Sequence, residues 1–109
     1  MSVEIDIEYQ GDLCCEAVHE PSGEILATEA PVDNGGQGRS FSPTDLTATA
    51  MGTCLMTIMG IVAKREGLDL RGMRARVIKE MASQPVRRIG ALTISLTMPS
   101  PRKKRSPSS

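Results

Sequence analysis

Aromatic side chains are almost absent from this sequence of 109 residues, which has one Tyr, one Phe and no Trp. Without aromatic rings the chain lacks stacking platforms for unpaired bases, so recognition of single-stranded nucleic acid by stacking is not expected. The core must be built from aliphatic side chains and seven Met, a flexible residue that fills irregular gaps. A chain of this length can bury roughly two thirds of its unfolded surface as a single domain.

Cysteine pairs at metal-ligand spacing are also missing. The cysteines are Cys14, Cys15 and Cys54, and the only histidine is His19, so we expect no zinc site, no other metal and no cofactor. The odd number of cysteines indicates a reducing compartment. The first ten residues are acidic and alternating and do not resemble a secretion signal. We therefore expect a cytoplasmic protein.

Net charge is zero, with 13 basic and 13 acidic residues, but the basic residues are concentrated near the C-terminus. Four of them occupy residues 102–105, so residues 1–101 carry nine basic and thirteen acidic residues, a net charge of −4. An acidic surface repels polyanions, and we expect no nucleic-acid partner. We predict one domain over residues 1–101 and a flexible basic tail at residues 102–109.

Alternating apolar and polar residues predict strands in the first thirty positions. Residues 3–9 alternate with period two, which indicates a strand with one buried face. Residues 13–19 and 24–30 read as a second and a third strand, separated by turns at Gly11 and at residues 21–23. An antiparallel meander is expected, followed by a glycine-rich loop at residues 31–40.

A long apolar helix is predicted from Ser42 to Gly67. Ser42 is suited to cap its N-terminus, Pro43 fits the first helical position, and Asp45 completes a capping box. The 18 uncharged residues 46–63 reach the lower limit for a membrane span. Their four Thr and two Gly, placed between strand-like segments, favour a buried helix and no membrane partner.

Two further strands are predicted after this helix, at residues 73–82 and 92–98, with a turn at Pro85 between them. The predicted fold class is α+β, with antiparallel β-β-β-α-β-β order and one long central helix. Because the helix is apolar nearly all round and long for so small a domain, a second molecule is expected to cover part of it.

Cys54 lies at the centre of the predicted helix. At ~100° per residue it shares a face with uncharged residues such as Thr47, Met51 and Ile58. Burial among them would disfavour the charged thiolate, and the helix N-terminus is too distant to stabilise it. The helix alone leaves two alternatives: an inert core thiol, or a reactive centre that a cation from elsewhere activates.

Three segments of the chain resemble the OsmC/Ohr family of small thiol-dependent peroxidases: A-P-V-D-N-G-G-Q-G, F-S-P-T-D-L and M-G-T-C-L-M-T. The resemblance covers about residues 1–100. It implies an intertwined homodimer with two long helices in the interface. It also implies that Cys54 is the nucleophile toward an organic hydroperoxide and that a small dithiol or dithiol-protein reductant regenerates it.

The chain departs from the family pattern around this thiol. Ohr members place a Glu ten residues before the reactive Cys, where this chain has Thr44, followed by Asp45. They also use an Arg from the N-terminal strands, whereas the first Arg here is Arg39. The family's second cysteine falls beyond Ser109. Our candidate for the missing cation is Arg39, which would reach the Cys54 thiolate from the glycine-rich loop or from the other subunit. Our candidate for a supporting carboxylate, which would not touch the sulfur, is Asp45.

The predicted function is an OsmC-like redox protein that reduces organic hydroperoxides through Cys54. The alternative is a non-enzymatic dimer of the same fold that binds an apolar or thiol ligand at the subunit interface. That pocket would be lined by Met51, Met56, Met59 and residues 34–41.

Overall fold

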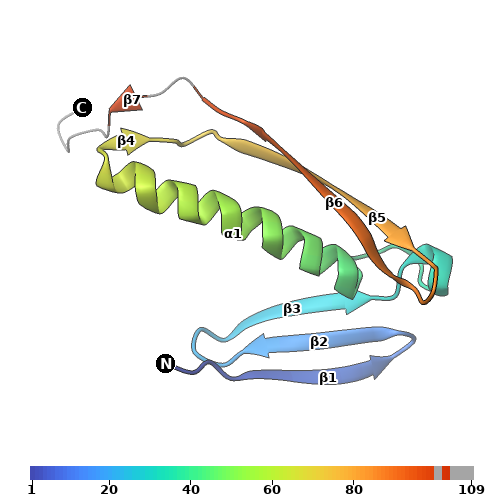
Figure 1. The fold of residues 1–109 in the computed structure, drawn as a ribbon. Helices are drawn as coiled ribbons and strands as arrows, with labels where there is room; N and C mark the ends of the chain where they lie inside the picture. The colour runs from blue at the N-terminus through green and yellow to red at the C-terminus, as the bar shows by residue number, and fades with distance from the viewer. Residues whose placement is uncertain (100–101, 104–109) are drawn as a thin grey trace. The chain divides into compact units, whose positions relative to one another are not determined.

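A computed structural model describes residues 1–99 and 102–103, and the chain forms two compact units, Met1–Leu46 and Thr47–Ser109. Over the described residues the order of elements is three strands, a short 3₁₀ turn, one long helix and four strands (Figure 1). The predicted β-β-β-α-β-β order is confirmed. The two additional strands, β4 and β7, are only two residues long each.

The first unit contains an antiparallel sheet in which consecutive strands are neighbours (Figure 1). Its strands are β1 Ile5–Gly11, β2 Cys14–His19 and β3 Glu24–Glu29. The tight turn between β1 and β2 places Asp12 and Leu13 at positive φ, 53° and 64°. All three strands coincide with the predicted ones to within two residues.

One face of this sheet is apolar and open. The register pairs Ile7 with Ala17 and Ala17 with Leu26, so these three side chains lie on the same face. Ile7 is 69% exposed and Leu26 is 42% exposed. The alternation of β1 was predicted correctly, but the prediction that its apolar face is buried is wrong for the single chain.

The helix, α1 Pro43–Arg65, begins with the predicted capping box. The Ser42 hydroxyl accepts a hydrogen bond from Asp45 N at 3.1 Å, and Asp45 Oδ2 accepts one from Ser42 N at 3.0 Å. Gly67, at φ 72°, follows the last turn as expected for a helix stop.

The helix α1 is also long and apolar enough to cross a membrane. Core helices of soluble proteins meet the same two criteria, so this finding does not distinguish between the two kinds of helix.

The rest of the second unit is a long two-stranded ribbon and a short strand pair. The elements are β4 Leu68–Asp69, β5 Arg74–Ala82, β6 Arg88–Thr97 and β7 Arg102–Lys103. β5 pairs with β6 and β4 with β7, both antiparallel (Figure 1). β6 begins four residues before its predicted start. The first two residues of the predicted basic tail, 102–103, form β7, and the rest of that tail, 104–109, lies outside the described residues.

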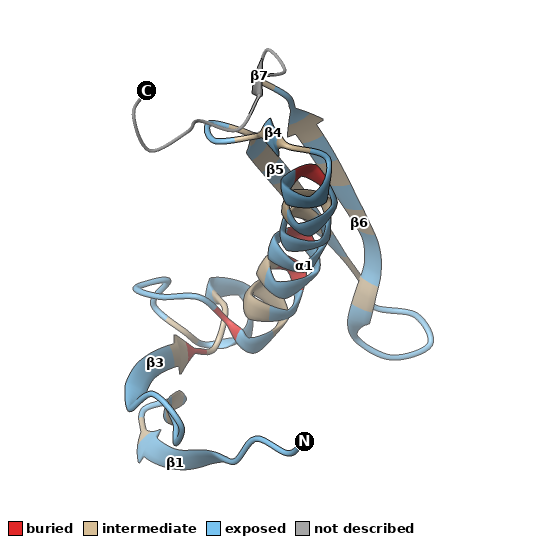
Figure 2. Ribbon diagram, turned by 90° about the vertical axis from the view of Figure 1, so that its left-hand side faces the viewer, coloured by how far each residue is buried: buried red, intermediate tan, exposed pale blue. Residues whose placement is uncertain are grey.

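Small residues form the side of α1 that packs against the ribbon. Ala48, Gly52 and Ala63 are buried, and a Cβ placed on Gly52 would lie 2.9 Å from Val77 Cγ2 of β5. Figure 2 shows that most of the remaining helix surface is exposed. Among the described residues Ala48 and Ala63 are the only buried apolar side chains, so much of the chain's apolar surface is still open.

Two helix glycines therefore respond oppositely to an added methyl group. Gly60→Ala meets open space and should raise the free energy of unfolding by about 0.5–1 kcal/mol, because Ala favours the helix. Gly52→Ala should lower it by about 1 kcal/mol or more, because the new methyl group crowds Val77. Urea unfolding followed by circular dichroism measures both. Equal stability of the two variants would contradict the close approach of α1 to β5.

Candidate functional site: an exposed helix thiol and a buried carboxylate

Cys54 lies on the open side of α1. Its side chain is exposed, so the packing of the single chain does not bury this thiol. Met51 and Ile58, each one helical turn away in sequence, are both 54% exposed. The thiol is therefore reachable from solvent and lies at the edge of an apolar stripe formed by Met51, Leu55, Ile58, Ile61 and Val62.

The buried charge of the first unit is Glu29, at the end of β3. Its side chain is only 3% exposed, yet the carboxylate is fully hydrogen-bonded. Oε2 accepts from Gln37 N at 3.0 Å and from Arg39 Nη2 at 3.0 Å, and Oε1 accepts from Arg39 N and Nε at 3.2 Å each. Four donors match the acceptor capacity of a carboxylate, so burial costs this group little.

The pKa of Glu29 falls from its usual 4.5 to about 2, chiefly because the Arg39 side chain hydrogen-bonds to the ionised form. The backbone N–H of Gln37 adds to the same effect. In return the carboxylate raises the pKa of Arg39 above its ordinary value. Both shifts favour the ionised form of the pair.

Arg39 also approaches a second thiol. Its Nη2 lies 3.9 Å from Cys14 Sγ, while the Cys14 thiol donates to the carbonyl of Asp12 at 3.4 Å. Cys15, the next residue, pairs with Tyr9 on the opposite face of the sheet, as adjacent residues of a strand must. Cys14 therefore lies beside a cation, a contact that the sequence did not indicate.

The loop that carries Arg39 allows no side chain at one of its glycines. A Cβ on Gly36 would lie 1.5 Å from the carbonyl oxygen of Ala30, and Gly36 N donates to Pro31 O at 2.9 Å. This close backbone approach folds residues 36–39 over Glu29. The predicted glycine-rich loop begins with the 3₁₀ turn Val32–Asn34 (η1) and is held by its hydrogen bonds to Glu29 and Pro31.

The three predicted site residues fall in different parts of the chain. Arg39 and Asp45 belong to the first unit, where Arg39 binds Glu29 and Asp45 caps α1; Cys54 belongs to the second. The roles assigned to Arg39 and Asp45 toward the thiol stay predictions. Within the described part of the chain, no group of three or more His, Cys, Asp or Glu side chains could hold a metal ion.

Charge is segregated between the two units. Residues 1–46 contain ten acidic residues and one arginine, a net charge of −9, whereas residues 47–109 contain twelve basic and three acidic residues, a net of +9. The overall balance of zero hides this division. The first unit is thus strongly acidic and the second strongly basic, and each favours ions of the opposite sign.

Two comparisons place the chain among known proteins. The family model described as OsmC-like protein matches residues 36–106. A crystal structure at 2.15 Å from Psychrobacter arcticus 273-4, described as an osmotic stress induced and detoxification response protein, is 40% identical in sequence. The match covers 95% of this chain and 73% of that one, with a TM-score of 0.82. No curated protein matches the chain significantly.

The Glu29 carboxylate should make the first unit sensitive to acid. Because its pKa is lowered in the folded protein, its contribution to stability is complete above pH 4.5 and is lost as the pH falls from 4.5 toward 2. Around pH 3 the wild type should therefore take up about one more proton on unfolding than Glu29→Gln does. Urea unfolding between pH 2.5 and 6 measures this slope, and identical slopes would contradict the buried ion pair.

Proposed function

Because this chain belongs to the OsmC-like family, we propose that it reduces organic hydroperoxides through the thiol of Cys54. The observation that carries the proposal is the exposure of Cys54 at the middle of α1, inside the region that the family model matches. The relative from P. arcticus is described as a detoxification response protein. Reduction of peroxides is a chemistry of that kind.

The proposed reaction begins at the Cys54 sulfur. The thiolate attacks the terminal oxygen of the hydroperoxide, the S–O bond forms and the O–O bond breaks. The alkoxide then takes up a proton and leaves as an alcohol. A dithiol reductant attacks the sulfenic acid and releases water, and its second thiol then displaces Cys54 from the mixed disulfide. Hydroperoxide and dithiol are converted to alcohol, water and a disulfide.

Arg39 is the cation that we propose for the thiolate. It is the only Arg or Lys among residues 1–46, and Glu29 fixes its guanidinium through a pair of hydrogen bonds. A guanidinium held in one orientation loses less conformational entropy when it binds an anion than a free side chain does. The Asp45 carboxylate already caps α1 through Ser42, so any support that it gives to Arg39 would be a second role.

A homodimer is the assembly that we propose. The exposed stripe on α1 consists of large aliphatic side chains, each of which would contribute about 1.5–3 kcal/mol if fully buried. A monomer that left this stripe in water would forgo that stabilisation. A second copy of the same helix offers a surface of the same chemistry.

The alternative is a binding protein without peroxidase activity. The exposure of Met51 beside Cys54 favours it, because Met side chains adapt to apolar ligands of varied shape. A folded dimer that consumed no hydroperoxide but retained an apolar or thiol ligand through purification would support this function instead.

Peroxidase activity should depend on one of the three cysteines. With cumene hydroperoxide and dithiothreitol, Cys54→Ser should lose at least a hundredfold in rate, because the nucleophile is removed. Cys14→Ser and Cys15→Ser serve as matched controls and should retain the activity. Trapping with a sulfenic-acid reagent, followed by mass spectrometry, should label Cys54.

The same assay examines Arg39. Arg39→Ala should slow both peroxide reduction and alkylation of Cys54, and Arg39→Lys should restore part of each rate. An unchanged alkylation rate in Arg39→Ala would exclude the proposed role of this residue, whereas peroxide reduction by Cys54→Ser would exclude the whole mechanism.

A charge within the helix stripe should break the dimer. Ile58→Asp places a carboxylate among the apolar side chains, whereas Thr53→Asp, an exposed position outside the stripe, serves as the control. Sedimentation should show a dimer for the wild type and Thr53→Asp, and a monomer or unfolded chain for Ile58→Asp. Circular dichroism distinguishes those two states. A dimer that survived Ile58→Asp would rule the stripe out as the interface.

A further inference from the structure

The second unit contains a pocket of about 470 Å³ where the end of α1 meets β4 and the turn before β5. Most of its wall is apolar, with Ala63 from the helix, Leu68 from β4, and Leu70 and Met73 from the turn. Its volume lies within the roughly 300–1,000 Å³ of small-molecule sites. A pocket with these walls is suited to a short hydrocarbon chain.

Three charged residues line the same pocket: Lys64, Asp69 and Arg71. Asp69 and Arg71 satisfy each other, because Asp69 accepts from Arg71 N at 2.9 Å and from Nε at 2.8 Å, with Nη2 at 2.6 Å. Among the described residues Lys64 forms no ion pair. The lining thus carries one net positive charge, which Lys64 supplies.

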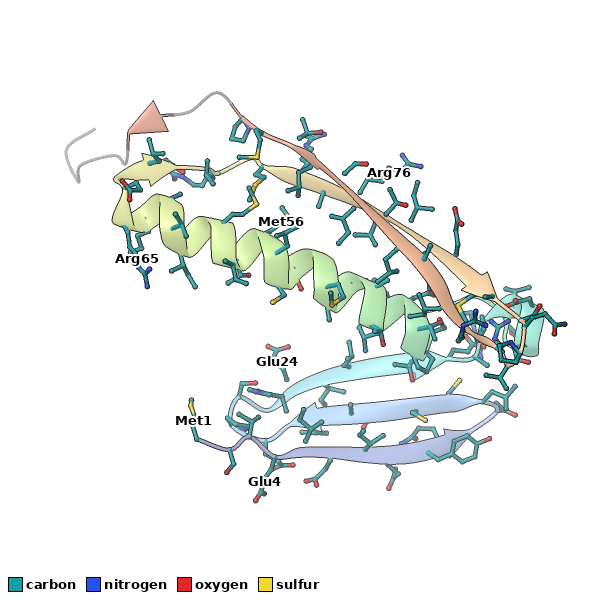
Figure 3. All side chains as sticks on the ribbon, viewed as in Figure 1. Met1, Glu4, Glu24, Met56, Arg65 and Arg76 are labelled. Carbon is teal, nitrogen blue, oxygen red and sulfur yellow. The ribbon has the colours of Figure 1, made fainter. Side chains whose placement is uncertain are left out.

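The surroundings reinforce that charge. Residues 47–109 carry a net charge of +9, so this unit as a whole favours anions over cations. Arg65 follows Lys64 in the chain but does not line the pocket, and Figure 3 shows it on the side of α1 away from β4. Lys64 and Arg65 therefore carry the same charge, but only Lys64 lines the pocket.

We propose that this pocket binds a medium-chain carboxylate, an apolar chain that ends in one anionic group. The chain would lie against Leu68, Leu70 and Met73, and the carboxylate would pair with the Lys64 ammonium. The site is separate from the proposed peroxidase centre. Ala63 follows Cys54 by nine residues, which places the two on opposite sides of α1 at ~100° per residue.

Most of the affinity should come from the hydrocarbon chain. Burial of one methylene changes a binding constant about fourfold, so hexanoate, octanoate and decanoate should bind with affinities that rise on the order of tenfold at each step. A partly exposed ion pair contributes less, about twofold to fivefold. Octanol, which lacks the charge, should bind more weakly than octanoate by that factor.

Titration of the full chain with octanoate, followed by methyl NMR, tests the proposal directly. Shifts should concentrate at Leu68, Leu70 and Met73. Lys64→Ala should weaken octanoate binding about twofold to fivefold and leave octanol binding unchanged. Arg65→Ala is the matched control with the same loss of charge, and it should bind octanoate like the wild type.

A second variant closes the pocket without disturbing the backbone. A Cβ on Gly60 meets no atom within 4 Å, so Gly60→Leu can place its side chain in the pocket and should abolish octanoate binding. The Ala side chain of Gly60→Ala is too small to fill the pocket, so this variant should still bind octanoate. Circular dichroism confirms that both variants are folded.

Several results would overturn this site: no dependence on chain length, methyl shifts that are spread over other regions, octanoate binding by folded Gly60→Leu, or equal losses in Lys64→Ala and Arg65→Ala. Cys54→Ser should bind octanoate like the wild type. A wild type that binds octanoate but reduces no hydroperoxide would refute the proposed function alone, and a wild type that reduces hydroperoxide but does not bind octanoate would refute this site alone.

Discussion

The carboxylate of Glu29 connects three stretches of the first unit: the end of β3, the glycine-rich loop and the residues that lead into α1. Its side chain holds Gln37 and Arg39, while its backbone N–H donates to Phe41 O at 3.0 Å. The helix cap at Ser42 follows immediately. Because residues 36–41 contain no regular secondary structure, their position depends on these bonds, and the start of α1 depends on their position in turn.

The two sides of α1 differ in side-chain size. Small residues such as Ala48 and Gly52 allow the backbone to approach β5 closely, and large aliphatic residues occupy the open side. This division explains how a small domain can contain a helix that is apolar on all sides. One side packs within the chain, and the other is available to a partner.

Signals that lie within a few residues of each other were predictable from the sequence. The capping residues at Ser42 and Asp45 and the stop at Gly67 place the helix to within two residues, and period-two alternation places β1. The start of β6 was missed because Gly90 and the arginines before it obscure the alternation. β4 and β7 are too short to produce any period.

Features that depend on residues distant in sequence were not predictable. Glu29 is one of ten acidic residues among residues 1–46, and nothing local distinguishes the one that becomes buried. The exposure of Cys54 depends on what covers the helix, which its own neighbours do not reveal. The charge division is present in the sequence, but it emerges only once the boundary between Leu46 and Thr47 is known.

The topology of the sheets has a consequence for the order in which the chain folds. β1, β2 and β3 pair with their neighbours in sequence, as do β5 and β6, and such local pairings form quickly because little loop entropy is lost. The pairing of β4 with β7 joins Leu68 to Lys103 and closes a much longer loop. During synthesis the first sheet can form as soon as about thirty residues have emerged from the ribosome, whereas the β4–β7 pair must wait until Lys103 has emerged as well.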